Sequence, residues 1–417
     1  MTYEQFLSLQ AKSVATGQHR LAQTSRGMLL QAAPDIFEAL SQAPDATFLE
    51  PLLFTYFGAS RAGTPLVDLP QLLLGYVEEP LRPEAIEVYV DARGRIDLPN
   101  IGWLLSEARS RQLVLLWEHD THRYRLEDEG APVSFRFEER LTLPGTAIEL
   151  CRYGNPLLED LLINSAQPRS PVHFEEGVER YAGQLAEALA LIERHMPEYY
   201  RDLSSVIRRI VLFRSETLNS CAALAAHGIA FLNVQEGSSV PRFVDDLVHQ
   251  CGHVIFNAFT VRRRDFVAVD PGSPIDAFTH QSEDARSVYT VLHGAYTEHF
   301  MTRCLRACDE ARVFSGQPAH ELRGLLAFIF QRAILDMRNL AAEGLFTPEG
   351  QALYDTFKQH VDEVCRDRPE LLRDDFSNQP YNFSYERFAQ LNPPGGPEHA
   401  ATAVLQAENI DTPAWGR

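Results

Sequence analysis

The sequence predicts an α+β fold, in which a mixed helical and β N-terminal region precedes a mainly helical domain with a small sheet. Short alternating apolar runs separated by Asp, Gly and Pro indicate strands between about residues 84 and 153. Apolar residues spaced by three and four indicate helices after residue 174. The polar, proline-containing stretch 164–174 separates the two patterns. We therefore predict an N-terminal region over residues 1–165, which could recruit a substrate, and a catalytic domain over 170–417.

The N-terminal region begins with helices and continues with hairpins. Residues 1–80 read as helical segments broken by prolines. The following runs, "AIEVYVDARGRIDLP", "QLVLLWEHDTHRYRLED", "APVSFRFEERLTLP" and "TAIELCRYG", read as strands. The Asp120-Thr121 pair lies between two such runs and is the best candidate for a hairpin turn.

The C-terminal domain is predicted as a series of helices. An amphipathic helix runs from Phe174 to about Ile192, and "VIRRIVLFRS" and "HGIAFLNVQEG" follow as two strands. Ser239 and Pro241 are suited to the cap and first turn of the next helix. Further helices are expected from about Ser282, over the segment "ELRGLLAFIFQRAILDMRNLAAEG" and from Thr347, with an irregular tail after about Arg373.

Composition and charge limit the class of partner. The 417 residues carry a formal net charge of −19, which argues against nucleic acid or an anionic membrane as the main partner. No apolar run is long enough to span a bilayer, and the polar start has no secretory pattern. We therefore predict a cytoplasmic protein whose six cysteines are reduced and whose partner is a peptide or a small molecule. The sequence has no signature of a particular oligomeric state.

The segment "DDLVHQCGHVIF" contains the strongest chemical signal. His249 and His253 are four residues apart in an expected helix, so both imidazoles lie on one face and can bind one metal ion. Hydrogen-bonded core histidines would also explain this spacing. The order of a strand, a capped turn and this helix is that of zincin-like folds, and the helical domain is therefore predicted to be zincin-like.

A third ligand is expected from the helix that contains "LHGAY". His293 shares a helical face with Arg286, Tyr289 and Tyr296, whereas Glu298 lies about 140° from His293 around the axis. We therefore predict His249, His253 and His293 as the metal ligands. Glu298 and His299 remain alternatives to His293.

The segments "LVHQCGHVIF" and "ARSVYTVLHGAY", about forty residues apart, resemble the H-E-x-x-H-type peptide-modification family, the 2-oxoglutarate-dependent peptide β-hydroxylases of ribosomal peptide natural products. The resemblance covers roughly residues 225–300. It implies Fe(II) and 2-oxoglutarate as cofactors. Arg286 and Tyr289 would bind the cosubstrate, and Gln250 and Tyr296 are candidate catalytic residues. Arg286 could instead form an ion pair with Glu283 or Asp284, and the two tyrosines could be core aromatics.

Gln250 occupies the position of the glutamate in the H-E-x-x-H motif. A zinc protease uses that glutamate as its general base, and a glutamine cannot accept the proton. An iron oxygenase needs no base at this position, and Gln250 could instead hydrogen-bond a ligand. The sequence therefore favours a C–H-hydroxylating oxygenase. The alternatives are a gluzincin-like hydrolase with Zn and Glu298, active or inactive, and a non-catalytic peptide-binding descendant.

Overall fold

The computed structural model describes residues 1–59, 67–165, 172–175, 177–216, 218–279, 284–379 and 382–394. The chain forms two compact units. We call Met1–Ala15, Gln184–Leu203 and Gly237–Arg417 the helical unit, and Thr16–Gly183 with Ser204–Glu236 the sheet unit. These units interleave along the chain, whereas the sequence predicts one boundary near residues 165–170. The predicted α+β class is confirmed.

The sheet unit contains all the strands in the described part of the chain. Its largest sheet is antiparallel in the order β1-β4-β5-β6, and a second has the order β2-β3-β7. In the third sheet, β10 pairs in parallel with β11 and β8 and antiparallel with β9. The bounds are β1 Ala85–Tyr89, β2 Arg95–Leu98, β3 Gly102–Ser106, β4 Gln112–Glu118, β5 Arg123–Asp128, β6 Ala131–Val133, β7 Phe135–Glu138, β8 Glu149–Leu150, β9 His173–Phe174, β10 Arg209–Arg214 and β11 Ile229–Asn233.

Two features of the sheet unit bear on the sequence predictions. The hairpin at Asp120-Thr121 is confirmed, because β4 and β5 pair around it with Glu118 opposite Arg123. Phe174, expected in a helix, belongs to β9. The third sheet is joined to the unit's core by a buried ion-pair network, in which Arg209 contacts Glu50 at 2.5 Å and Glu149 at 2.9 Å.

Short helices of the sheet unit precede, separate and follow these strands along the chain. Their bounds are α2 Pro34–Ala39, α3 Asp45–Phe48, α4 Pro51–Ala59, α5 Leu69–Leu73, η1 Leu74–Tyr76, η2 Glu79–Leu81, α6 Pro156–Ser165 and η3 Leu224–Ala226. Three helices contribute residues to both units, namely α1 Tyr3–Ala32, α7 Glu179–His195 and α8 Pro197–Val206.

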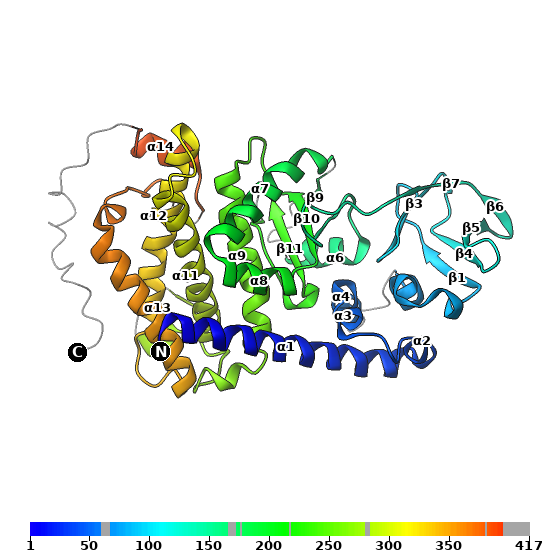
Figure 1. The fold of residues 1–417 in the computed structure, drawn as a ribbon, viewed down its shortest axis with the longest axis horizontal. Helices are drawn as coiled ribbons and strands as arrows, with labels where there is room; N and C mark the ends of the chain where they lie inside the picture. The colour runs from blue at the N-terminus through cyan, green and yellow to red at the C-terminus, as the bar shows by residue number, and fades with distance from the viewer. Residues whose placement is uncertain are drawn as a thin grey trace. The chain divides into compact units, whose positions relative to one another are not determined.

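The helical unit is built on α9, α11, α12 and α13 (Figure 1), with α9 and α12 both packed against α11. Its elements are α9 Val240–Phe259, η4 Arg263–Asp265, α10 Asp276–Thr279, α11 Val288–Glu310, α12 Gly316–Asn339, α13 Pro348–Asp367, η5 Pro369–Leu372 and α14 Tyr385–Leu391. The predicted cap of α9 is confirmed, because the Ser239 hydroxyl accepts a hydrogen bond from the Arg242 amide at 3.2 Å.

The expected boundaries differ in three places. Helix α11 begins at Val288 behind the capping hydroxyl of Ser287, later than the predicted Ser282, which lies outside the described residues. Helix α12 ends at Asn339, before Gly344, because Ala341–Gly344 already form a turn and Gly344 has a φ of 77°. The tail, predicted as irregular, contains α14, which buries Phe388 and is capped by Ser384.

The structure does not support the zincin-like description of the helical domain. That prediction places the strands now seen as β10 and β11 in the same domain as the histidine helix. Both strands instead belong to the sheet unit, whereas α9 belongs to the helical unit. Strand β10 pairs with β11, β8 and β9, so this sheet is built from strands of the sheet unit although β11 directly precedes α9 in the sequence.

Candidate metal centre

The candidate centre begins with two histidines on α9. Buried apolar residues of this helix, including Leu247, Val248 and Phe256, pack it into the core of the helical unit. His249 and His253 stay partly exposed, and their ring centres are 4.7 Å apart. Neither ring makes a hydrogen bond to a described residue. The two imidazoles are therefore neighbours on one helix face, and no described residue forms a hydrogen bond with their nitrogens.

The third imidazole comes from α11. The His293 ring centre lies 4.4 Å from that of His253, and Phe256 packs 4.8 Å from His293 on the α9 side. The His293 Nε2 lies 3.3 Å from the backbone oxygen of His253. Three imidazoles from two packed helices thus form one cluster, which we call the three-histidine cluster.

All three imidazoles are neutral near pH 7. Burial lowers the pKa of His253 to about 4. Burial also lowers the pKa of His249 and of His293 well below the usual value, and the nearby His253 ring adds to both shifts. A neutral imidazole has the free nitrogen lone pair that a metal ligand needs.

The cluster fits a metal ion in donor type and ring spacing. Two imidazoles that bind one ion at about 2.1 Å have ring centres roughly 4.5–5 Å apart, close to the spacings found here. Within the described residues, however, no three His, Cys, Asp or Glu side chains have their donor atoms gathered around one point. The His293 ring, turned toward a backbone oxygen, would have to rotate to complete a three-nitrogen site.

The two alternative ligands, Glu298 and His299, lie away from the three-histidine cluster and contact other residues. Glu298 is buried near Arg332, at 3.9 Å, and burial raises the pKa of its carboxyl well above the usual value. His299 accepts a hydrogen bond from Arg303 Nε at 3.1 Å, and its ring packs 4.6 Å from that of His360. His293 is thus the α11 candidate that the structure brings beside the α9 pair.

The two candidate catalytic residues are buried. Gln250 is 2% exposed, and its Oε1 has no hydrogen-bond partner in the described chain. The Tyr296 hydroxyl donates to Gln10 Oε1 at 3.0 Å, and Gln10 Nε2 donates to Asp202 at 2.7 Å. These contacts give Tyr296 a packing role between α1 and α11.

The two candidate cosubstrate residues already have protein partners. Arg286 forms ion pairs with Asp284 at 2.7 Å and with Asp336 at 2.5 Å. This resembles the ion-pair alternative of the sequence analysis, with Asp336 of α12 as an additional partner, while Glu283 lies outside the described residues. The Tyr289 hydroxyl lies 2.7 Å from Thr260 Oγ1, and its ring centre is 5.6 Å from that of His293.

A further cation, Arg263, lies beside the three-histidine cluster, and it was not among the residues predicted from the sequence. Arg263 of η4 is exposed and makes no ion pair with a described residue, and its guanidinium carbon lies 4.1 Å from the Tyr289 ring centre. Burial is the main cause of the lowered pKa of His293, and the charge of Arg263 adds to it. The run Arg262-Arg263-Arg264, directly after α9, is the signal that could have indicated this residue.

No model of a known protein family matches the chain, and no curated protein sequence is similar to it. Among the described residues, no helix combines the length and apolar character needed to cross a lipid bilayer.

Proposed function

We propose that the protein is an Fe(II)- and 2-oxoglutarate-dependent oxygenase that hydroxylates a C–H bond of a peptide or peptidyl substrate. The observation that supports this proposal is the three-histidine cluster, with ring centres 4.4 and 4.7 Å apart. His249, His253 and His293 would hold the iron. When bound, iron and 2-oxoglutarate together use O₂ to place one oxygen atom on the substrate and the other in succinate, with loss of CO₂.

The charge of the cluster favours this cofactor pair. Three neutral imidazoles leave a ferrous ion with its full 2+ charge, which a dianionic keto acid compensates. The far carboxylate of that acid needs a cation. Arg263 is accessible and has no carboxylate partner among the described residues, whereas two carboxylates already bind Arg286. We therefore assign the far carboxylate to Arg263.

The cluster is less suited to peptide hydrolysis. Gln250 cannot take a proton from water, and the structure places the carboxylate of Glu298 beside Arg332. The peptide class of the substrate rests on the resemblance of "LVHQCGHVIF" and "LHGAY" to the peptide hydroxylases. The proposal requires no zincin-like domain.

The first experiment measures metal binding without turnover. The purified chain is loaded anaerobically with Fe(II), and bound iron is counted per protein. We expect about one iron per chain, and at least tenfold weaker binding in His249→Ala and His293→Ala. His119→Ala, which removes an exposed histidine of the sheet unit, is the matched control and should bind iron normally.

The second experiment measures succinate released from 2-oxoglutarate by the loaded protein. We expect release that is lost in His293→Ala and unchanged in His119→Ala. Iron binding without succinate release would contradict the oxygenase. Zinc bound in preference to iron, with peptide hydrolysis gained in Gln250→Glu, would indicate the hydrolase instead. Absence of any metal binding would indicate the peptide-binding descendant.

A further inference from the structure

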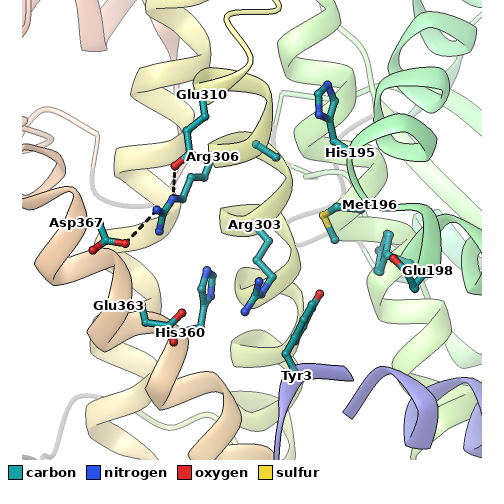
Figure 2. A pocket seen from close by; sticks show the side chains of 12 residues that line it. Tyr3, His195, Met196, Glu198, Arg303, Arg306, Glu310, His360, Glu363 and Asp367 are labelled. Atoms are coloured by element: carbon teal, nitrogen blue, oxygen red, sulfur yellow. Dashed lines mark hydrogen bonds and ion pairs between the residues drawn. The ribbon is translucent and has the colours of Figure 1, made fainter. Parts of the chain in front are cut away.

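A cavity of about 390 Å³ lies in the helical unit, and none of its lining residues belongs to the three-histidine cluster. Its walls come from the start of α1, the junction of α7 and α8, and helices α11 and α13 (Figure 2). Its volume is in the range of small-molecule sites. Five lining residues decide its chemistry, namely Tyr3, Glu198, Arg303, His360 and Glu363.

Arg303 is a cation with which no carboxylate in the described part of the chain forms an ion pair. Its Nε donates to the neutral imidazole of His299 at 3.1 Å, and its guanidinium carbon lies 3.7 Å from the Tyr3 ring centre. It forms no ion pair with a described residue. By contrast Arg306, one turn later, contacts Glu310 at 2.6 Å and Asp367 at 3.1 Å. Burial lowers the pKa of Arg303, although an arginine remains charged at neutral pH. Arg303 is partly buried, and a partly desolvated charge is stabilised when an anion neutralises it.

Two further polar groups face the same space. In Figure 2 the Arg303 guanidinium lies between the His360 ring and the Tyr3 phenol, whose hydroxyl points into the cavity. His360 is 4% exposed, and its ring makes no hydrogen bond to a described residue. The Tyr3 hydroxyl likewise has no hydrogen-bond partner in the described chain. Arg303, Tyr3 and His360 therefore form a set of donors that suits one carboxylate.

Most of the other charged groups in the lining are carboxylates. Glu198 and Glu363 also line the cavity and form no ion pair with a described residue. With Glu310 and Asp367 there are four carboxylates against two guanidinium groups. A multiply charged anion such as phosphate or citrate would be repelled by these carboxylates. A ligand that carries one carboxylate and one ammonium group would match both parts of the lining.

We propose that this cavity binds a free amino acid. Its carboxylate is held by Arg303 with Tyr3 and His360, and its ammonium group faces Glu198, which lies on the other side of Arg303 from His360 (Figure 2). The cavity is large enough for the side chain as well. This inference does not depend on the metal or on the proposed reaction.

The test is calorimetric titration of the full chain with each of the twenty amino acids, and with acetate, ethylamine and phosphate as partial probes. We expect at least one amino acid to bind, and each partial probe to bind at least tenfold more weakly. Arg303→Gln and Tyr3→Phe should each weaken amino-acid binding, the first at least tenfold. Tyr3→Phe keeps the ring against Arg303, so it tests the hydroxyl if Arg303→Gln fails to fold.

Two further variants separate the ammonium contact from surface charge. Glu198→Gln removes an exposed carboxylate of the cavity and should weaken amino-acid binding without weakening acetate binding. Arg366→Gln, at an exposed position of α13 outside the cavity, should change neither. The proposal is overturned if no amino acid binds at millimolar concentration. It is also overturned if acetate or phosphate binds as tightly as every amino acid, or if binding is unchanged in Arg303→Gln, Tyr3→Phe and Glu198→Gln.

Discussion

Replacing Tyr296 by phenylalanine tests whether this residue acts in packing or in catalysis. Its side chain is fully buried, and its hydroxyl donates to Gln10 Oε1 at 3.0 Å. Gln10 Oε1 accepts no other hydrogen bond from a described residue. Because the variant keeps the ring, the aromatic contact with Phe256, with ring centres 4.6 Å apart, remains. The substitution therefore removes one buried hydrogen bond and leaves one buried acceptor without a donor.

The size of the effect follows from that acceptor. An unsatisfied buried acceptor costs roughly 1–3 kcal/mol, so we expect Tyr296→Phe to lower the free energy of unfolding by about that amount. Tyr289→Phe is the matched control, because the hydroxyl that it removes contacts Thr260 Oγ1. That oxygen keeps its bond to the Phe256 backbone oxygen at 2.6 Å. The control should therefore lose less, below about 1 kcal/mol.

The assay is urea unfolding followed by circular dichroism at 222 nm, which reports on helices. Tryptophan fluorescence is unsuitable, because the two described tryptophans, Trp103 and Trp117, belong to the sheet unit. The succinate released by each folded variant is measured as well, so that stability and turnover can be compared. If Tyr296→Phe unfolds like the wild-type protein but loses turnover, the packing role derived from the contact with Gln10 is refuted and Tyr296 acts on substrate.

Three other substitutions have expected outcomes. Arg286→Gln should lower the free energy of unfolding by roughly 1–3 kcal/mol, because the buried Asp336 loses its ion pair with Arg286. A raised KM for 2-oxoglutarate with unchanged urea unfolding would assign Arg286 to the cosubstrate instead. Arg263→Gln should raise that KM at least tenfold without changing urea unfolding, and an unchanged KM would refute the assignment. Burial lowers the pKa of His227 to about 3, below the roughly 6.5 of an unfolded histidine. The unfolded state therefore binds the extra proton, and stability falls as the pH drops from about 6.5 toward 3, by roughly 2 kcal/mol at pH 5. Urea unfolding at pH 7 and pH 5 should show a smaller difference in His227→Gln, and an equal difference would contradict this linkage.

Local signals predict several elements of the fold, including α9, which carries two histidines of the cluster. The start of α9 follows from Ser239 and Pro241, and the start of α13 follows from Thr347, whose hydroxyl accepts from the Gly350 amide at 3.2 Å. The hairpin at Asp120-Thr121 is local as well. Each of these features depends on residues within a few positions of one another, so the sequence contains the whole interaction.

Contacts between distant residues were not predictable in the same way. Arg286 pairs with Asp336, which lies 50 residues later on α12. Phe174 joins β10, which begins 35 residues later in the sequence, at Arg209. Arg263 owes its position beside Tyr289 to a turn after α9 whose direction the apolar pattern does not determine. In each case the packing of helices and strands determines which distant residue the side chain contacts.

Helical phase predicted which α11 side chain lies beside the α9 histidines, whereas it could not predict the ion pairs between distant residues. Two packed helices bring one face of each together, and side chains at other angles around the axis meet different neighbours. Tyr289, His293 and Tyr296 share the α11 face that contacts Phe256 of α9. Glu298 lies about 140° from His293 on an ideal helix, and it is found beside Arg332 of α12. His299 is nearer in angle but further along the axis, where it meets His360 of α13. Once α9 contacts the His293 face of α11, neither Glu298 nor His299 can replace His293 without a rotation of the whole helix. Such a rotation would move the fully buried Phe300 away from its ring contacts with Phe6 and Tyr199.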